Sequence, residues 1–196
     1  YTIHAPYNDC NPGNLNESLR QAMADRLIET LNLAAEIGAG AVVTHGGAVS
    51  RDYPERVQAY AREQAVRTIR KAAEHADTVG VPLCVENQRI KEKKRYNTST
   101  PDDLAAFLDD VGTEFEHLGI TLDVGHAKAS GIDVKSFVER FGDRIVVAHL
   151  HDNDGTSDDH DPLPRYDSVA AEVGAPYNVL EMKSKDDIKR CVQPTE

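Results

Sequence analysis

The most constraining feature of this sequence is a regular alternation of short apolar runs with longer amphipathic segments. The short runs, rich in β-branched and apolar residues, are predicted to be strands at Tyr1–Ala5, Ala41–His45, Pro82–Glu86, Gly119–Asp123, Ile145–Leu150 and Asn178–Met182. The segments between them place apolar residues at helical spacing and are predicted to be helices. An alternation of this kind favours an α/β fold, in which parallel strands form one sheet that helices cover.

The segments between the strands predict helices with clear end signals. The helices span Asn16–Ile37, Pro54–Val79, Pro101–Val111, Ile132–Phe141, Tyr166–Val173 and Lys183–Cys191. The third begins with Thr100 as the N-cap residue and Pro101 at the first helical position. No Gly-x-Gly-x-x-Gly motif follows the first strand, so a dinucleotide-binding fold has no support.

The number of strand–helix units limits the architecture. A complete (β/α)8 barrel has eight such units in about 250 residues. This chain has 196 residues and shows six units. We therefore expect a single domain of the (β/α)8 type over residues 1–196, with the first two strands lying upstream of Tyr1. An open sheet, or a sheet completed in a homo-oligomer, is the alternative.

Composition restricts the partners of the chain. A net charge of −11 repels phosphate backbones, which argues against nucleic acid as a partner. No run approaches the roughly 18 apolar residues of a bilayer span, so no membrane partner is expected. Cys10, Cys84 and Cys191 are too widely spaced for a disulfide framework or a zinc knuckle. Reduced thiols and a cytoplasmic location are the expectation.

The predicted strands end in titratable residues, which are costly beside an apolar core unless something pairs with them. These residues are His4, His45, Glu86, Asp123, His149 and Glu181, with His126 and His151 close behind two of the strands. One such residue alone is commonly a hydrogen-bonded core residue. In a parallel barrel, however, all strand ends face one mouth, where barrel enzymes place their chemistry. Since converging carboxylates repel one another and no Lys or Arg occupies these ends, we expect a divalent cation between them.

Other histidines, a cysteine and a basic run lie outside the strand ends. His75 and His117 lie in or beside predicted helices among acidic residues, and we interpret them as surface residues. Cys84 is expected to face the barrel interior as a small apolar residue. The basic run 89–96 directly follows Glu86, so it belongs to a loop over the mouth. That run is either a solvated loop or a binding site for an anionic group such as phosphate.

Several motifs together resemble a known family. The segments "IHAPY", "VVTHGG", "CVENQ", "TLDVGHA", "HLHDNDGTSDDHDPLP" and "VLEM" occur in the order found in the xylose isomerase-like TIM barrels. That superfamily includes sugar and sugar-phosphate isomerases and epimerases as well as the endonuclease IV DNA-repair enzymes. The resemblance spans nearly the whole chain and implies a TIM barrel. The chain departs from the family after its Asp-x-His pair, where 162–166 reads Pro-Leu-Pro-Arg-Tyr in place of a Leu-Gly-Glu-Gly turn.

The same resemblance implies roles for individual residues. The metal set of the sugar epimerases falls on Glu86, Asp123, His149 and Glu181, and the endonuclease IV pattern adds His4, His45, Asp158 and His160, with His126 as a further position. One to three divalent ions are therefore implied. Mixed nitrogen and oxygen ligands accept Zn, Mn, Fe or Mg.

Three functions compete for such a barrel. The preferred one is isomerisation or epimerisation of a small sugar or sugar phosphate through a metal-stabilised enediolate. In it, Glu86 and Glu181 form the acid/base pair. The residues expected to bind the substrate are His126, His151, Asn87, Arg89 and Lys93. The second function is hydrolysis of abasic-site DNA, which the filled metal positions favour and the acidic charge opposes. The third is a non-catalytic barrel that binds a metal or a sugar.

Overall fold

Six parallel strands form the main sheet of this computed structural model, which describes residues 1–192. The strands are β1 (Thr2–His4), β2 (Ala41–His45), β4 (Leu83–Glu86), β6 (Leu118–Asp123), β7 (Ile145–Leu150) and β8 (Tyr177–Leu180). Their order in the sheet is β1-β2-β4-β6-β7-β8, and all neighbouring pairs are parallel. The predicted strands are thus confirmed, with bounds that differ by one or two residues.

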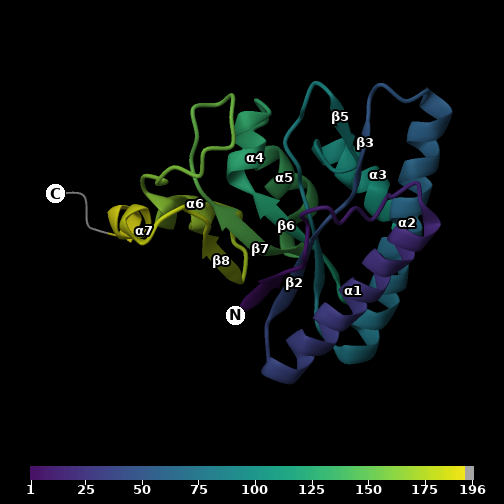
Figure 1. Cartoon of the computed structure of the whole chain (residues 1–196). Coiled ribbons are helices and arrows are strands. Elements are labelled where there is room, and N and C mark those ends of the chain that lie inside the picture. The colour runs from purple at the N-terminus through teal and green to yellow at the C-terminus, as the bar shows by residue number, and fades with distance from the viewer. Residues whose placement is uncertain (193–196) are drawn as a thin grey trace.

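Helices follow the strands and pack on the outside of the sheet. They are α1 (Glu17–Ile37), α2 (Glu55–Val79), α3 (Pro101–Val111), α5 (Val134–Phe141), α6 (Tyr166–Val173) and α7 (Lys185–Val192). Figure 1 shows α1 and α2 side by side along one side of the sheet and α6 and α7 at the other end. The capping box of α3 joins Thr100 and Asp103, as its sequence predicts. No helix within residues 1–192 is long and apolar enough to cross a membrane.

Four short elements were not predicted, one of them the 3-10 helix η1 (Gly142–Arg144) between α5 and β7. β3 (Ala48–Ser50) and β5 (Lys94–Tyr96) form an antiparallel pair outside the main sheet. The helix α4 (Val124–Ala129) begins directly after β6, and the carboxylate of Asp123 accepts a hydrogen bond from its first turn. A helix shorter than two turns shows no helical periodicity, and β3 and β5 do not lie within a longer apolar run like those of the main-sheet strands.

The sheet curves strongly, so that its two ends approach each other. At the mouth, the rings of His4 at the end of β1 and His149 in β7 have centroids 6.0 Å apart. At the opposite end, Tyr177 at the start of β8 lies against Gly40, where a Cβ atom would come within 2.1 Å of the tyrosine ring. Gly40 is therefore required for this close approach. The curvature agrees with the barrel type that the strand–helix rhythm predicts.

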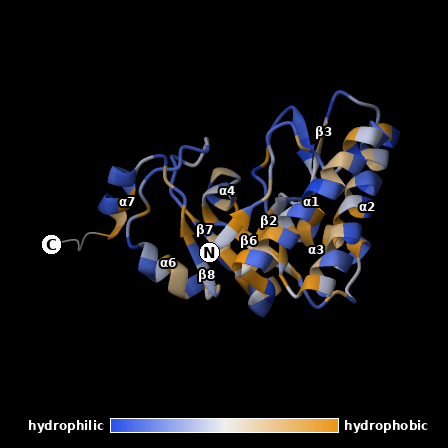
Figure 2. Cartoon of the chain, turned by 60° about the horizontal axis from the view of Figure 1, so that its bottom comes forward, coloured by the Kyte–Doolittle hydropathy of each residue, from blue (hydrophilic) through white to orange (hydrophobic). Residues whose placement is uncertain are grey.

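Side chains on the two faces of the strands enter different environments. The outward face packs against the helices in the main core, which includes Val42, Leu83, Ile120 and Leu122. Figure 2 shows this hydrophobic layer between sheet and helices, with hydrophilic residues on the outer helix surfaces. The inward face holds a much smaller apolar cluster of Ala41, Val43, Cys84 and Val147. Since side chains alternate along a strand, the next inward positions lie at the mouth.

Candidate metal centre

The inward positions at the strand ends converge on one place. Two residues beyond Val43, Cys84 and Val147 come His45, Glu86 and His149, respectively. The sheet register pairs His45 with Glu86 and Asp123 with His149. The alternation along the strands therefore places apolar side chains inside the barrel and potential ligands at its mouth.

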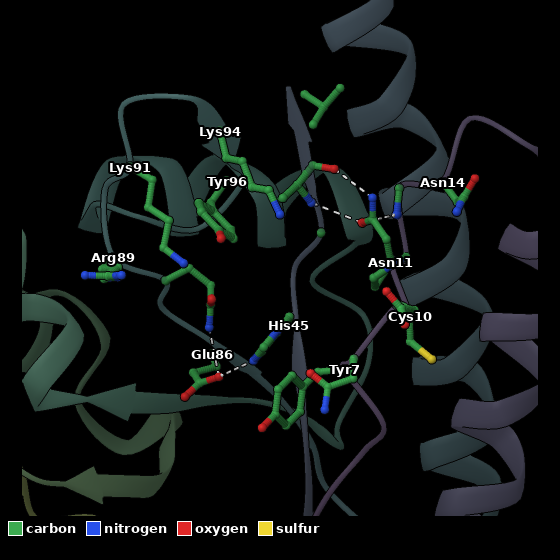
Figure 3. A pocket seen from close by; sticks show the side chains of 18 of the residues that line it. Tyr7, Cys10, Asn11, Asn14, His45, Glu86, Arg89, Lys91, Lys94 and Tyr96 are labelled. Carbon is green, nitrogen blue, oxygen red and sulfur yellow. Dashed lines mark hydrogen bonds and ion pairs between the residues drawn. The ribbon is translucent and has the colours of Figure 1, made fainter. Parts of the chain in front are cut away.

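Glu86 lies at the middle of this convergence. Its Oε2 atom is 3.0 Å from His45 Nε2 and 3.6 Å from His4 Nε2. Its Oε1 atom is 3.0 Å from His149 Nδ1. Gln88 Nε2 donates a further hydrogen bond to Oε2 at 2.9 Å, and Figure 3 shows His45 directed at the carboxylate. Glu86 thus connects two sets of ligands through its two oxygens.

These two sets are called here the strand-end groups. The first comprises His4, His45 and Glu86, and the second comprises Glu86, Asp123, His149 and Glu181. Within each group, one ligand atom per residue lies within 4.8 Å of all the others. Each group offers three or more imidazole or carboxylate ligands, which is what a transition-metal or zinc site requires.

The electrostatics of the strand-end groups follow from burial and mutual pairing. Burial alone would raise the pKa of Glu86, but hydrogen bonds with His149, His4 and His45 hold that pKa well below its usual value. Burial lowers the pKa of His149, yet its contacts with Glu181 and Glu86 raise that pKa well above the usual value for histidine. In the absence of a cation, protonated imidazoles therefore balance the buried carboxylates.

A second arrangement comes from the segment HLHDNDGTSDDH. Backbone hydrogen bonds of 2.9 Å in both directions between Asp152 and Asp161 close this loop at its base. The closure turns Asp158 and His160 back toward the mouth, where the His151 and His160 rings stack with centroids 4.1 Å apart. His151, Asp158 and His160 are called here the loop group. His151 and His160 also lie close enough to Glu181 for the three to share a cation.

The loop group contacts the strand-end groups through His126 in α4. His126 Nε2 is 3.2 Å from Asp158 Oδ2, and its Nδ1 is 3.4 Å from Asp123 Oδ2. Burial lowers the pKa of His126, but the charge of Asp123 and the contact with Asp158 raise it to about 10. His126 therefore joins ligands of both arrangements.

One buried oxygen tests whether these residues fit a cation. Asp158 Oδ1 is buried and has no hydrogen-bond partner within residues 1–192. It faces His160 Nε2 at 3.6 Å and His151 Nε2 at 3.9 Å, both beyond hydrogen-bond length. A buried carboxylate oxygen without a partner is costly, and a shared cation would satisfy it. The donor set therefore fits a divalent metal ion.

Three residues expected to touch substrate do not line the cavity. Asn87 is buried, and its amide is engaged at both ends with the backbone of Asp123. His151 is also buried, with its Nε2 3.1 Å from Asp123 Oδ1. Lys93 is exposed and does not line the cavity. Asn87 and His151 instead hold Asp123 in place. The prediction was wrong for them because motif order along the chain does not indicate which side chains become buried behind the ligands.

The structure also identifies residues that the sequence did not. Gly125 leaves room for His151, since a Cβ atom there would lie 2.0 Å from its imidazole. Lys91 and Lys94 line the cavity together with Arg89. The glycine within "LDVGHA" was a signal that could have been used, because an isolated glycine at the end of a strand pattern can mark a close approach to the backbone. Away from the mouth, the surface positions of His75 and His117 and the inward position of Cys84 are confirmed.

A cavity of about 890 Å³ opens above the ligands. The metal-ligand side contributes His4, His45, Glu86, His126, Asp158, His160 and Glu181 to its lining. The other side is formed by residues 7–16 and by the β3–β5 pair, as Figure 3 shows. Asn11 joins these two segments, because its side chain bonds the backbone of Ala48 in both directions. The volume is in the range of small-molecule sites.

Comparisons with known proteins agree with this architecture. A crystal structure of a D-tagatose 3-epimerase-like protein superposes with a TM-score of 0.82 at 25% identity, over 97% of this chain and 73% of that one. An L-ribulose 3-epimerase structure superposes with a TM-score of 0.71 at 18% identity, over 95% of this chain and 63% of that one, which indicates the fold alone.

Sequence relatives point to the same fold family. An uncharacterized protein of Methanocaldococcus jannaschii is 30% identical over 164 residues, which is 81% of this chain and 53% of that protein. A probable endonuclease 4 of Mycobacterium leprae is 31% identical over 157 residues, which is 77% of this chain and 56% of that protein. The chain thus spans about half the length of these two relatives. Residues 1–173 match the family described as xylose isomerase-like TIM barrel, and the chain belongs to that family.

Proposed function

We propose that this chain carries the metal centre of an isomerase or epimerase that acts on a small sugar or sugar phosphate. The observation that carries the proposal is the cavity of about 890 Å³, which has two carboxylates of the strand-end groups, Glu86 and Glu181, on its lining. The 25% identity and similar fold of the protein described as D-tagatose 3-epimerase-like support the same class of reaction. A divalent cation held by these ligands would polarise a substrate carbonyl and the hydroxyl beside it.

The two carboxylates differ in how free they are to move a proton. Both oxygens of Glu86 have partners, in His149, His45 and Gln88. Glu181 contacts His149 through Oε2 at 3.2 Å, and its side chain is 36% exposed. Contact with His149 keeps its pKa lowered against the effect of burial, so Glu181 is ionised at neutral pH. We therefore assign proton abstraction from carbon first to Glu181, with Glu86 as its partner in the acid/base pair.

His126 has the position expected of a group that orients the substrate. It lines the cavity, and Asn87 fixes its ring through a 2.9 Å contact between the Asn87 carbonyl and Nδ1. The Nε2 edge faces Asp158 and the cavity. A hydroxyl of the substrate could replace Asp158 as the partner of His126 Nε2.

The test of this proposal is hydrogen exchange in heavy water. The purified protein, loaded with Mn, Zn or Mg, is incubated with a panel of ketoses and ketose phosphates. Deuterium should appear at the carbon next to the carbonyl, and Glu181→Gln should abolish the label. The exposed Glu36 on α1 gives a matched control, since Glu36→Gln should leave the rate unchanged. Exchange that persists in Glu181→Gln contradicts the assignment.

One observation favours a second function, hydrolysis of phosphodiesters at abasic sites in DNA. Glu86 connects two ligand groups, and the loop group adds further ligands, so several cations could bind. The 31% identity to a probable endonuclease 4 points in the same direction. The net charge of −11 opposes DNA binding. Cleavage of an abasic-site duplex by the metal-loaded protein, without sugar exchange, would favour this alternative, and metal binding with neither activity would indicate a non-catalytic barrel.

A further inference from the structure

We infer that the cavity has a subsite for the phosphate monoester of a small substrate, formed by Arg89, Lys91 and Lys94. The inference rests on the proposed function and names its substrate class: phosphorylated sugars rather than neutral ones. All three side chains line the same cavity as the metal ligands. Figure 3 shows them on the side of the cavity formed by β5 and the segment before it.

The loop that carries these cations is fixed at both ends. The Gln88 N–H donates to the Thr98 carbonyl at 3.2 Å, which closes the loop at its base. The Thr98 hydroxyl donates to the Glu86 carbonyl at 2.8 Å, so the base is attached to the metal-ligand strand. Between these points, β5 pairs with β3. The cations are therefore held on a framework and not on a freely solvated loop.

Strand geometry places Lys94 in the cavity, and an aromatic contact places Lys91 there. Within β5, Lys94 and Tyr96 line the cavity and Arg95 does not, as alternation requires. Lys91 Nζ lies 5.5 Å from the centroid of the Tyr96 ring, a cation–π distance that keeps the ammonium on the cavity side. Lys93 and Arg95 are on the same loop but outside the cavity lining. They are natural controls.

These cations have no carboxylate partner. Within residues 1–192, Arg89, Lys91 and Lys94 make no ion pair within 4.0 Å, whereas Arg62 and Lys71 pair with Asp110 and Asp25, respectively. The Nε atom of Arg89 is buried and lacks a hydrogen-bond partner. Lys93 and Arg95 also make no ion pair within residues 1–192, so the distinguishing observation is that Arg89, Lys91 and Lys94 lie together on the cavity lining. A buried donor without a partner is costly until a ligand satisfies it.

The chemistry of the three side chains suits a phosphate monoester. The planar guanidinium of Arg89 can donate two parallel hydrogen bonds to phosphate oxygens, and the two lysines add point charges. The net charge of −11 opposes anions at long range, but this repulsion is screened beyond about 8 Å at physiological salt. The same cavity is lined by the metal ligands, so a substrate with its phosphate here would share the cavity with them.

The experiment measures binding of inorganic phosphate to the metal-loaded protein by isothermal titration calorimetry. Arg89→Gln, Lys91→Gln and Lys94→Gln should each weaken binding about tenfold, the loss of one charge-assisted hydrogen bond. Lys93→Gln and Arg95→Gln should change binding less than about twofold, with circular dichroism as the check of folding. Arg89→Lys should fall between wild type and Arg89→Gln. Phosphate binding that is absent in wild type, or unchanged in the three cavity variants, overturns the inference.

A second comparison identifies the source of the phosphate. Glycerol 3-phosphate, a monoester, should bind at least tenfold more tightly than dimethyl phosphate, a singly charged diester. Equal binding of the diester would point to a nucleic-acid backbone and overturn the inference. Failure of the proposed function has a different signature, because phosphate binding would then depend on Arg89 while no sugar in the panel exchanged its proton. Exchange of neutral sugars that is insensitive to Arg89→Gln would contradict the phosphate subsite but agree with the proposed isomerase or epimerase function.

Discussion

The strand-end groups and the loop group present the same ligand types on different supports. Glu86, Asp123 and His149 are on strands and are at most 3% exposed. Asp158 and His160 are on a loop, with side chains 24% exposed, and His4 and His45 reach a similar exposure of 25% and 24% although they end strands of the sheet. His160 also has a left-handed backbone with φ of 56°, which a non-glycine residue adopts only when its surroundings hold it there. The strand-end groups are thus positioned by the sheet, whereas the loop group depends on its own contacts.

This difference predicts which ligands should bind a cation more tightly. Ligands on a rigid framework lose little conformational freedom when a metal binds, and ligands on a loop lose more. We therefore expect a tight site at the strand-end groups and a weaker one at the loop group.

The largest effect is expected for Glu86→Gln. Loss of this carboxylate removes a ligand from both strand-end groups, so affinity for Zn or Mn should fall by more than about 100-fold, the upper range for altering even an indirect ligand. The metal-free variant should also lose about 3 kcal/mol of folding free energy, because His149 loses its buried partner. Chelator competition and urea unfolding measure the two effects. Unchanged metal affinity would contradict the assignment of Glu86 as a ligand in both strand-end groups.

The next largest effect is expected from pH, because the histidines at the mouth are paired with carboxylates in the metal-free protein. Histidine ligands must be neutral to bind a metal, and His126 and His149 have raised pKa values in the metal-free protein, to about 10 for His126. Affinity for Zn should therefore rise between pH 6 and pH 9, by up to about tenfold per unit for each proton displaced. In the metal-free protein the sign reverses: the stability from these histidines is fully present below their unfolded pKa and is lost as pH rises through the folded pKa. A flat affinity profile would contradict the pairing described here.

A smaller effect is expected for His160→Gln. This change removes one ligand of the loop group and leaves the strand-end groups intact, so only the weaker metal equivalent should lose affinity, by about tenfold to 100-fold. His75→Gln is the matched control, because His75 lies on α2, outside the metal-ligand groups, and forms a hydrogen bond with Asn32. Loss of the tight equivalent in His160→Gln would show that the loop group and not the sheet supports the main site.

The smallest effect is expected at a histidine–carboxylate pair far from the mouth. Asp77 accepts hydrogen bonds from the backbone of His117 at 2.7 Å and of Glu116 at 3.3 Å. Burial raises the pKa of Asp77, but these bonds lower it overall, so this stabilisation is present above the unfolded pKa and is lost as pH falls. Asp77→Asn should cost about 1 kcal/mol in urea unfolding and leave metal affinity unchanged. A change in metal affinity would contradict the interpretation of Asp77 and His117 as a pair that stabilises the fold without contributing to the metal centre.

The contrast between strand and loop residues also explains which parts of the site could be predicted from the sequence. Strand alternation predicts that Glu86, Asp123 and His149 share one face, because the period of a strand is fixed. It cannot predict that the 152–161 loop closes on itself, or that Asn87 and His151 become buried behind Asp123. The β3–β5 pair was missed for a related reason, since three-residue strands outside the main sheet have no readable pattern. The basic run was located correctly over the mouth, but the choice of Lys94 over Arg95 depends on the alternation within β5, and Lys91 precedes that strand.

The most direct test of the central claim is anomalous diffraction from crystals of the zinc-loaded protein. We predict a strong anomalous peak among Glu86, Asp123, His149 and Glu181, about 2.0–2.2 Å from the ligating nitrogen and oxygen atoms. A second, weaker peak is expected near Asp158 and His160. Zinc-loaded crystals with no peak at Glu86, or with the four side chains directed at protein partners only, would contradict the account.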